Sequence, residues 1–538
     1  MTGAPAWPVT AQWNFGDLLD ATAAAVPPDR PALIHGDRVI DWATFDARTN
    51  SLARAMLASG LTTGDRVAVL ARNIPEYIEV AAAIFKARLT YVNINYRYTT
   101  AEIDYVLSDS GAKSLFFQAE FAGVAGPLLA GLTLPVQIGG VGDSYEAMVA
   151  GANADGGAPL GIARSPDDGY MIYTGGTTGR PKGLLWRSGD ARAIQLESPT
   201  IKSVIRTMDD HVAVVRGNPA PGRVLPACPL MHGAGLNSST AELVGGGTVI
   251  LLESPGFDAE ELWDAAARNK VTRVLIVGDV FARPMARALE AHPGRWDLSA
   301  MRIVSSAGLM WSEEVKASLV RSLPQVTLVD ILGASEASGF GYAITTATAS
   351  TPTGLFEIGP ATVLVDPDTD RVLGPDEVGE GLIARPPPFA QGYHGDPAKT
   401  ATVFRTIAGT LYAIPGDMGA RDADGRLRLI GRGNMCINTG GEKVFPEEVE
   451  EELKRQPGVE DAMVLGIPDD TWGKAVAALI ATAPGFDADA VREGLKANLA
   501  AYKVPRRIFE VAEVPRHASG KGDYRSGAEA IARLLAGE

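Results

Sequence analysis

The sequence predicts an α/β fold, with a large N-terminal domain of mostly parallel sheets and helices and a small, mobile C-terminal α+β domain. Short β-branched runs alternate with longer segments whose apolar residues recur every three or four positions. This alternation is typical of parallel strands joined by helices. The length of 538 residues exceeds what one hydrophobic core usually organises, so two or more domains are expected.

Four short apolar runs in the first part of the chain are predicted to be buried strands. They lie at residues 66–73, 271–278, 302–308 and 326–333. Two of the segments between them, residues 51–60 and 312–323, carry apolar residues at helical spacing. The glycine-rich stretch at 139–161 is interpreted as a surface connection.

The character of the sequence changes after about residue 430. A charged segment that opens at Pro446 and ends near Pro457 predicts a helix, and residues 461–470 and 475–483 predict strands. The polar, glycine-rich segment before them is interpreted as a hinge. We therefore place an N-terminal domain at 1–431 and a C-terminal lid at 432–538, with the hinge near 432–436.

Composition excludes several classes of partner. A formal net charge of −15 makes nucleic acid an unfavourable partner, because no basic field offsets the repulsion of phosphates. No apolar run approaches the roughly 18 residues of a membrane span, and the N-terminus lacks the pattern of a secretory signal. The two cysteines, Cys228 and Cys436, form no metal-binding cluster. A cytoplasmic protein without an integral membrane segment is expected, and homo-oligomerisation stays open.

The stretch YTGGTTGRPKG at residues 173–183 is predicted to bind phosphate. Its glycines let the backbone approach an anion closely, its threonines offer hydroxyl donors, and Lys182 adds a positive charge. It is not a Walker A loop, because Arg180 and Pro181 separate the lysine from the preceding glycine. The competing interpretation is a glycine-rich turn between a strand and a helix.

Together with six further motifs in the same order, this loop resembles the phosphate loop of the adenylate-forming superfamily, which includes acyl-CoA synthetases, amino-acid adenylation domains and luciferases. The motifs are PACPLMHGAGL, SSAGLMW, DILGASE, QGYHGDPAKTATVF, PGDMGARDADGRLRLIGR and ASGKGDYR, at residues 226–236, 305–311, 330–336, 391–404, 415–432 and 518–525. The resemblance implies that ATP activates a carboxylic acid as an acyl-adenylate, with release of pyrophosphate, and that a thiol such as coenzyme A then takes the acyl group. Mg²⁺ is the implied metal.

The resemblance also implies which residues bind ATP. The phosphate loop would hold the β- and γ-phosphates, and small residues after two strands would border the adenine. Asp417 would accept hydrogen bonds from the ribose hydroxyls, and Arg432 would contact the ribose or the phosphate beside it. The loop and adenine residues are Thr174, Gly175, Gly176, Thr177, Thr178, Gly179 and Lys182, and Ala307, Gly308, Asp330, Ile331, Leu332, Gly333, Ala334 and Ser335.

Three residues are implied to act in catalysis. Glu336 would ligate Mg²⁺, and Lys521 would bridge the carboxylate and the α-phosphate during adenylation. His232 would lie at the acyl pocket, where it would shape the carboxylate end or gate access. The alternatives are a solvated strand end for Glu336, a satisfied core histidine for His232 and an exposed lysine for Lys521.

The resemblance further implies that the lid rotates about Asn434 between the two half-reactions. Lys521 would then leave, and the loop with Gly440, Gly441 and Lys443 would enter to meet coenzyme A. Lys443 would steer the phosphates of coenzyme A or simply be exposed.

Several positions depart from the family pattern. Leu332 stands where an aromatic residue is usual and Ser335 replaces a threonine, while Asn434 and Asn438 replace charged residues near the hinge. The overall motif set, extended by Trp186 and Arg187, is most similar to bacterial fatty-acyl-CoA synthetases that include ligases for steroid side-chain carboxylates. The leading prediction is therefore an AMP-forming acid:CoA ligase for a hydrophobic carboxylate, with ATP, Mg²⁺ and coenzyme A as cofactor and cosubstrates.

Three other functions are compatible with parts of the motif set. An enzyme that loads an acyl or aminoacyl group onto a carrier protein is the first rival, but the aminoacyl form needs an aspartate in the LMHGAGL motif, and Asp279 lies elsewhere. A light-emitting oxygenase would fit the same fold without being required by any residue. A non-catalytic nucleotide-binding regulator is disfavoured by the retention of the polar motif residues.

Overall fold

The computed structural model describes residues 13–152, 156–176, 179–198, 203–308, 311–367, 369–432, 437–444, 446–484, 486–515 and 524–537. The chain divides into two compact units. The first holds the described parts of Met1–Tyr96, Leu107–Tyr173 and Gly183–Gly431, and the second those of Arg97–Val106, Thr174–Lys182 and Arg432–Glu538.

The largest sheet of the first unit has thirteen strands, in the order β16-β17-β21-β22-β15-β14-β13-β12-β11-β9-β10-β1-β2. Its centre, from β13 to β1, is parallel, and its two ends are antiparallel. The strands are β1 Pro31–His35, β2 Arg38–Asp41, β9 Arg223–Pro226, β10 Thr248–Leu251, β11 Arg273–Ile276, β12 Ile303–Ala307, β13 Thr327–Leu332, β14 Gly341–Thr345, β15 Leu355–Ile358, β16 Val363–Val365, β17 Gly379–Ala384, β21 Asp417–Arg421 and β22 Leu427–Arg432.

A second sheet has seven strands, in the order β18-β8-β7-β4-β3-β5-β6. Strands β6, β5, β3, β4 and β7 run parallel, whereas β18 pairs antiparallel with β8. Its strands are β3 Arg66–Leu70, β4 Thr90–Asn93, β5 Ser114–Gln118, β6 Leu134–Ile138, β7 Gly169–Gly176, β8 Gly179–Arg187 and β18 Gly392–Tyr393, and a separate hairpin consists of β19 Phe404–Ile407 and β20 Thr410–Ala413.

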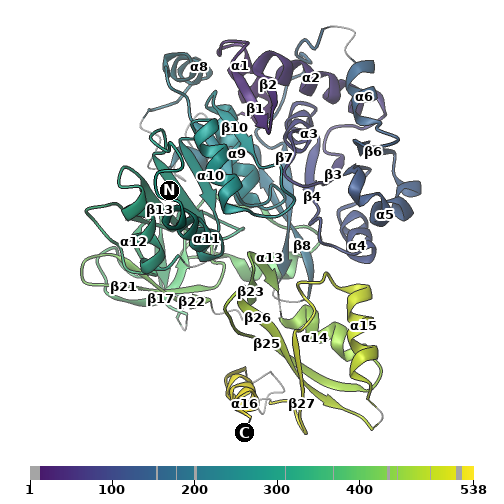
Figure 1. Ribbon diagram of the computed structural model, residues 1–538, viewed down its shortest axis with the longest axis vertical. Coiled ribbons are helices and arrows are strands. Elements are labelled where there is room, and N and C mark those ends of the chain that lie inside the picture. The colour runs from purple at the N-terminus through teal and green to yellow at the C-terminus, as the bar shows by residue number, and fades with distance from the viewer. Residues whose placement is uncertain are drawn as a thin grey trace. The chain divides into compact units, whose positions relative to one another are not determined.

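The helices cover these sheets, and α9 to α12, in teal and green, lie beside the parallel strands in Figure 1. Several begin at side-chain caps: Asn14 and Thr207 form capping boxes, and Asp41 and Asp258 accept hydrogen bonds from the first turn. The helices are α1 Phe15–Ala23, α2 Trp42–Ala58, α3 Pro75–Lys86, α4 Thr100–Ser110, α5 Ala122–Ala125, α6 Tyr145–Gly151, α7 Ser188–Leu196, α8 Met208–Gly217, α9 Gly233–Val244, α10 Ala259–Arg268, α11 Gly278–Ala291, α12 Glu313–Ser322 and α13 Pro397–Val403, with 3₁₀ turns at Ala119–Phe121 and Gly126–Gly131.

The four predicted strands are confirmed as β3, β11, β12 and β13, and the two predicted helices lie in α2 and α12. The interpretation of residues 139–161 as a mere connection is wrong in part, because α6 forms inside it. Tyr145 explains this helix: its side chain is buried, and its hydroxyl donates to Glu79 Oε2 at 2.5 Å. The buried Tyr145 thus stabilises a short helix although glycines surround it in the sequence.

The second unit contains a three-stranded sheet of β25 Val459–Asp469, β26 Gly473–Thr482 and β27 Arg507–Glu510. Alternate residues of its strands face two separate cores, as the period of a β-strand requires. Helices α14 Pro446–Lys454 and α15 Ala488–Asn498 cover one face, and α16 Tyr524–Ala536 covers the other (Figure 1). The helix and both strands predicted for this region are confirmed.

Part of the predicted hinge segment forms a hairpin of β23 Ile437–Thr439 and β24 Glu442–Val444. Ile437 and Val444 are buried against the sheet of the second unit. The hinge proposed at 432–436, apart from the backbone of Arg432, lies outside the described residues.

Candidate active site

The predicted phosphate loop lies between two neighbouring strands, β7 and β8, rather than between a strand and a helix. Two glycines are required by close packing, one at the start of β7 and one at the end of the loop: a Cβ on Gly169 would lie 1.9 Å from Trp186 O, and one on Gly183 would lie 2.5 Å from Met171 Sδ. Thr174 and Lys182 are half-buried on the strands, while Thr177 and Thr178 lie outside the described residues. Gly175, Gly176 and Gly179 belong to the strand ends.

Asn93, at the end of β4, ties this loop to the histidine-bearing motif. Its Nδ2 donates to Tyr173 O at 3.1 Å and to Met231 O at 2.8 Å, and its Oδ1 accepts from Tyr173 N at 2.6 Å. Asn93 is only 4% exposed, so all three bonds form out of water, where unmade bonds are costly. Sequence analysis missed this residue, because nothing in its local pattern signals a partner 138 residues away.

His232 lies immediately before α9, as the N-cap residue of that helix, and is half-buried. The preceding motif residues are held by Asn73, whose Oδ1 accepts from Leu230 N at 2.8 Å and whose Nδ2 donates to Cys228 O at 3.0 Å. The amides of Asn73 and Asn93 therefore position the chain that leads into His232.

Glu336 follows β13 in a loop that is fixed from several sides. The hydroxyl of Tyr393, in β18, donates to Glu336 Oε1, and Ala390 N donates to Glu336 O at 2.9 Å. Trp186 Nε1 donates to Ser335 O at 3.0 Å. The carboxylate is half-buried, so the strand-end alternative of a freely solvated glutamate does not describe it.

An ion pair between a buried arginine and a partly exposed glutamate supports the same loop. Arg385 is 1% exposed, and its Nη2 donates to both carboxylate oxygens of Glu197 at 3.0 Å. Its Nη1 donates to Ser338 O. The sequence motif that contains Tyr393 was recognised, but the contributions of Tyr393 and Arg385 to positioning Glu336 were not, because both partners come from distant segments.

The predicted adenine wall is formed where β12 and β13 end side by side. Ala307 pairs with Ile331, and Asp330 pairs with Ser306. Gly308 is exposed and has a φ of +96°, a conformation that favours glycine. Leu332 is 9% exposed and belongs to the hydrophobic core, while Ile331, Gly333, Ala334 and Ser335 are half-buried.

Asp330 carries an unusual charge environment. Burial raises the pKa of Asp330 to about 7, Lys316 opposes this rise electrostatically, and Asp279 adds to it. Lys316 is only 2% exposed, and its own pKa is lowered by burial. Asp279 is engaged elsewhere: its Oδ1 accepts from Ser312 N at 2.9 Å, and Arg283 contacts its Oδ2 at 3.1 Å.

The remaining predicted residues are distributed over the chain as follows. Asp417 begins β21 and is 6% exposed, and Arg432 ends β22. Asn434 and Lys521 lie outside the described residues. Asn438 and Lys443 pair with each other across the β23–β24 hairpin.

Gly440 and Gly441 form the turn of that hairpin with φ values of +57° and +86°. A Cβ on Gly440 would lie 2.3 Å from Trp472 Cε3, and Gly440 N donates to Trp472 O at 3.1 Å. The space beside Gly440 is therefore occupied by the indole of Trp472. Sequence analysis did not single out this tryptophan.

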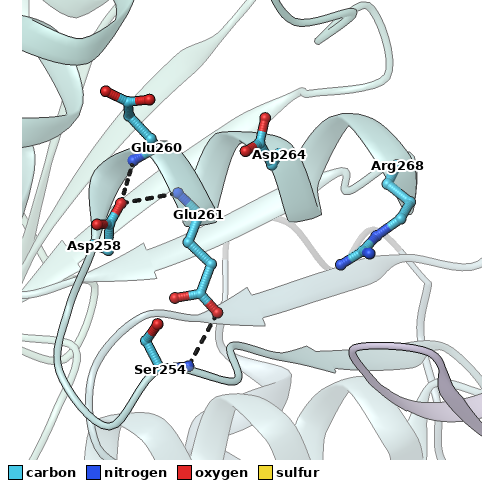
Figure 2. Close-up of a pocket in the computed structure, with 6 residues that line it drawn as sticks. All are labelled: Ser254, Asp258, Glu260, Glu261, Asp264 and Arg268. Atoms are coloured by element: carbon cyan, nitrogen blue, oxygen red, sulfur yellow. Dashed lines mark hydrogen bonds between the residues drawn. The ribbon is translucent and has the colours of Figure 1, made fainter.

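Of two hollows among the described residues, only one includes predicted site residues. A cavity of about 560 Å³ in the second unit includes Arg180 and Lys182 of the phosphate loop together with Glu448 and Arg455. The acidic hollow in Figure 2 contains none of the predicted site residues. Its carboxylates serve the fold: Asp258 caps α10, and Glu261 accepts from Ser254 N at 3.1 Å.

Comparison with known proteins identifies the class. A family model described as AMP-binding enzyme matches residues 20–394, and one described as AMP-binding enzyme C-terminal domain matches residues 448–521. The chain therefore belongs to the AMP-binding enzyme family, which confirms the resemblance drawn from the motifs, and the chain is an enzyme of that family.

Individual relatives share nearly the full length. The chain is 35% identical to a medium/long-chain-fatty-acid–CoA/3-oxocholest-4-en-26-oate–CoA ligase of Mycobacterium marinum, over 95% of both chains. It is 35% identical to the medium-chain acyl-CoA ligase Mig of Mycobacterium avium, over 96% of this chain and 98% of the relative. A 3-oxocholest-4-en-26-oate–CoA ligase of Rhodococcus rhodochrous is 33% identical over 95% of both.

Among solved structures, the amide bond synthetase McbA from Marinactinospora thermotolerans is similar with a TM-score of 0.78 and 25% identity, over 96% of this chain and 99% of that one. The o-succinylbenzoate CoA synthetase from Bacillus subtilis has a TM-score of 0.77 at 22% identity, over 95% and 97%. These likenesses confirm the predicted fold class. No helix in the described part of the chain has both the length and the apolar character of a membrane span.

Proposed function

We propose that the protein is an ATP-dependent, AMP-forming acyl-CoA ligase that activates a hydrophobic carboxylic acid, either a fatty acid or a steroid side-chain carboxylate. The observation that carries this proposal is the Asn93 clamp, which joins the phosphate loop to the His232 motif. The clamp holds Tyr173, at the start of the loop, and Met231, next to His232, on one side chain. The names of the full-length relatives, which are CoA ligases for such acids, support the substrate class.

The first half-reaction joins two anions, so positioning and charge neutralisation dominate the barrier. A carboxylate oxygen attacks the α-phosphorus, the bond to the β-phosphate breaks, and pyrophosphate leaves. In this proposal Thr174, Thr177, Thr178 and Lys182 hold the departing phosphates, and Asp417 accepts hydrogen bonds from the ribose hydroxyls. Lys521 stabilises the charge that develops between acid and α-phosphate.

We propose Glu336 as the protein ligand of Mg²⁺. Among the described residues no group of three or more histidine, cysteine or acidic side chains is placed to hold a metal. A single carboxylate fits Mg²⁺ nonetheless, because this ion usually takes one or two protein carboxylates and completes its shell with phosphate oxygens and water. The ion would neutralise phosphate charge, while Tyr393 keeps the Glu336 carboxylate oriented.

The second half-reaction transfers the acyl group to coenzyme A with loss of AMP. We propose that residues 432–538 act as a lid on a domain at 1–431, turning near Asn434 so that Lys521 leaves and the β23–β24 hairpin takes its place. Gly441 would then pass close to the pantetheine arm, and Lys443 would attract the phosphates of coenzyme A. A cytoplasmic location is part of the proposal, since ATP and coenzyme A are the cosubstrates.

The test is a turnover assay with purified protein, ATP, Mg²⁺, coenzyme A and a panel of fatty, aryl and steroid acids. Release of pyrophosphate and AMP, dependent on both acid and coenzyme A, is the expected result. Binding of ATP without turnover of any acid would instead indicate a nucleotide-binding regulator and overturn the proposal.

A further inference from the structure

Arg192, on α7, is a buried cation without an acidic partner in the described part of the chain. Its side chain is 4% exposed, its Nη1 donates to Gln195 Oε1 at 3.2 Å, and its Nε has no hydrogen-bond partner. Burial lowers the pKa of Arg192 to about 10. A guanidinium removed from water is costly unless a charge or a set of acceptors replaces the water, so this arrangement points to a missing partner.

The acids near it in sequence are already engaged. Asp190 accepts from Arg187 Nε at 2.6 Å and Nη2 at 2.9 Å, and Glu197 is bound by Arg385. His211, on α8, is a neutral imidazole at pH 7 and does not offset the charge of Arg192, because burial and that charge together lower the pKa of His211 to about 4. At neutral pH neither Gln195 nor His211 therefore carries a charge that offsets the Arg192 guanidinium.

Other buried cations of the same unit show the contrast. Lys86 pairs with Asp20 at 3.1 Å and Asp46 at 2.6 Å, and Arg164 Nη1 contacts Asp20 at 2.8 Å. Arg385 pairs with Glu197 at 3.0 Å. The fold supplies each of these three cations with a carboxylate, which Arg192 lacks among the described residues.

The position of Arg192 relates it to the helix that follows His232. Gln195, its hydrogen-bond partner, donates through Nε2 to Asn237 O on α9 at 3.5 Å, and the hydroxyl of Tyr170 donates to Asn237 Oδ1 at 3.3 Å. Asn237 lies five residues beyond His232, which corresponds to about 7.5 Å along a helix axis. Arg192 is thus connected to α9 well beyond the end that we assign to the substrate carboxylate.

We propose that Arg192 is a specificity-determining residue that receives a second, hydrogen-bond-accepting oxygen at the far end of the acid substrate. The preferred acid then carries a distal carboxylate or carbonyl oxygen rather than a plain alkyl end. This inference rests on the proposed function. The inference follows from Arg192 Nε, a buried hydrogen-bond donor without an acceptor. A site that donates a hydrogen bond to a substrate oxygen discriminates strongly against an analogue without that oxygen.

The experiment compares kcat/KM for acids of matched chain length that end in a methyl group, a methyl ketone or a second carboxylate, from hexanoate to dodecanoate and their ω-substituted counterparts. Wild-type protein is expected to favour at least one of the two oxygen-bearing series. Arg192→Met should lose about tenfold to hundredfold on that series, as expected for a charge-assisted hydrogen bond, and little on the methyl series. The control is Arg216→Met, an exposed arginine of α8, which should leave the preference unchanged.

Thermal unfolding without ATP provides a second measurement that needs no turnover. The preferred acid should raise the unfolding temperature of the wild-type protein more than its methyl-ended counterpart, and Arg192→Lys should keep part of that difference. Removing the unpaired charge should also leave free Arg192→Met at least as stable as the wild type.

The outcomes separate the two proposals. Activation of plain acids with no preference for a distal oxygen, or a preference that Arg192→Met retains, overturns the inference and leaves the ligase function standing. A wild-type protein without a differential thermal shift also counts against it, even if Arg192→Met does not fold. Failure to activate any acid overturns the proposed function itself.

Discussion

The hydroxyl of Tyr393 donates a hydrogen bond to Glu336 Oε1, so two motifs that lie 57 residues apart meet at one carboxylate. The tyrosine comes from β18 and the glutamate from the loop after β13. Because the phenol is neutral, it orients the carboxylate without cancelling its charge. This relationship is what a metal-binding glutamate needs from its surroundings.

Replacement of Tyr393 by phenylalanine tests that role. The ring and its packing remain, while the donor is lost, so the apparent affinity for Mg²⁺ in the adenylation assay should fall by about tenfold to hundredfold. The measurement is pyrophosphate release as a function of Mg²⁺ concentration. An unchanged Mg²⁺ dependence together with lower overall stability would assign Tyr393 a purely structural role.

The pair of Glu197 and Arg385 is expected to matter for stability. Glu197→Gln leaves the Arg385 guanidinium, 1% exposed, without its counter-charge. Because the Glu197 side chain is itself 31% exposed, we expect the loss in the free energy of unfolding to lie between that of a surface pair and that of a buried pair, about 1–3 kcal/mol. Denaturant titration measures the loss. Glu357→Gln, at a carboxylate of β15 without such a partner among the described residues, serves as the control and should change little.

Asp330 predicts a pH dependence of stability. Its pKa is raised to about 7 by burial, whereas its ordinary value is 3.8. Between about pH 4 and pH 7 the folded state holds a proton that the unfolded state has lost, so the contribution of Asp330 to stability falls as pH rises through this window. Above pH 7 the penalty is complete, and it amounts to at most roughly 4 kcal/mol.

Asp330→Asn removes this penalty. The variant should gain stability over the wild type as pH rises from 5 to 8, because the amide does not ionise. Unfolding free energies measured across that range provide the comparison, and parallel pH profiles for the two proteins would contradict the prediction.

Gly440 is predicted to be irreplaceable for reasons of packing. An alanine there would meet the indole of Trp472 and would adopt a φ of +57°, which alone costs about 1–2 kcal/mol for a residue with a side chain. Gly440→Ala should therefore lower the thermal stability of the second unit, whereas Gly473→Ala, which has the same kind of φ but open space around it, should cost less. Equal losses would mean that Trp472 does not constrain the turn.

Lys521→Ala separates the two half-reactions. The proposal requires a loss of roughly 10²- to 10³-fold in adenylation but a smaller loss when synthetic acyl-adenylate and coenzyme A are supplied. Lys182→Ala should behave similarly, since pyrophosphate has already left before thiolation. Equal losses in both assays would refute the assignment of Lys521 and Lys182 to adenylation alone. Circular dichroism of the variants checks that they are folded.

The family and much of the secondary structure of this protein could be predicted from its sequence alone. The glycines, threonines and Lys182 of the phosphate loop, and the order of the seven motifs, predicted the family because they are local patterns along one chain. The strands β3, β11, β12 and β13 were predicted because apolar β-branched runs report burial without reference to a partner. Helix α6 was not predicted, because it is stabilised by the contact of Tyr145 with Glu79, which is distant in sequence.

Only the tertiary structure decided which side chains support the site. Asn93, Tyr393 and Arg385 act through partners 47 to 188 residues away, and such pairings arise when sheets and loops pack, so no local spacing signals them. The same holds for Arg192, which belongs to none of the seven sequence motifs. Its burial without a carboxylate is a property of the folded chain, because electrostatic cost depends on what surrounds a charge and not on where it stands in the sequence.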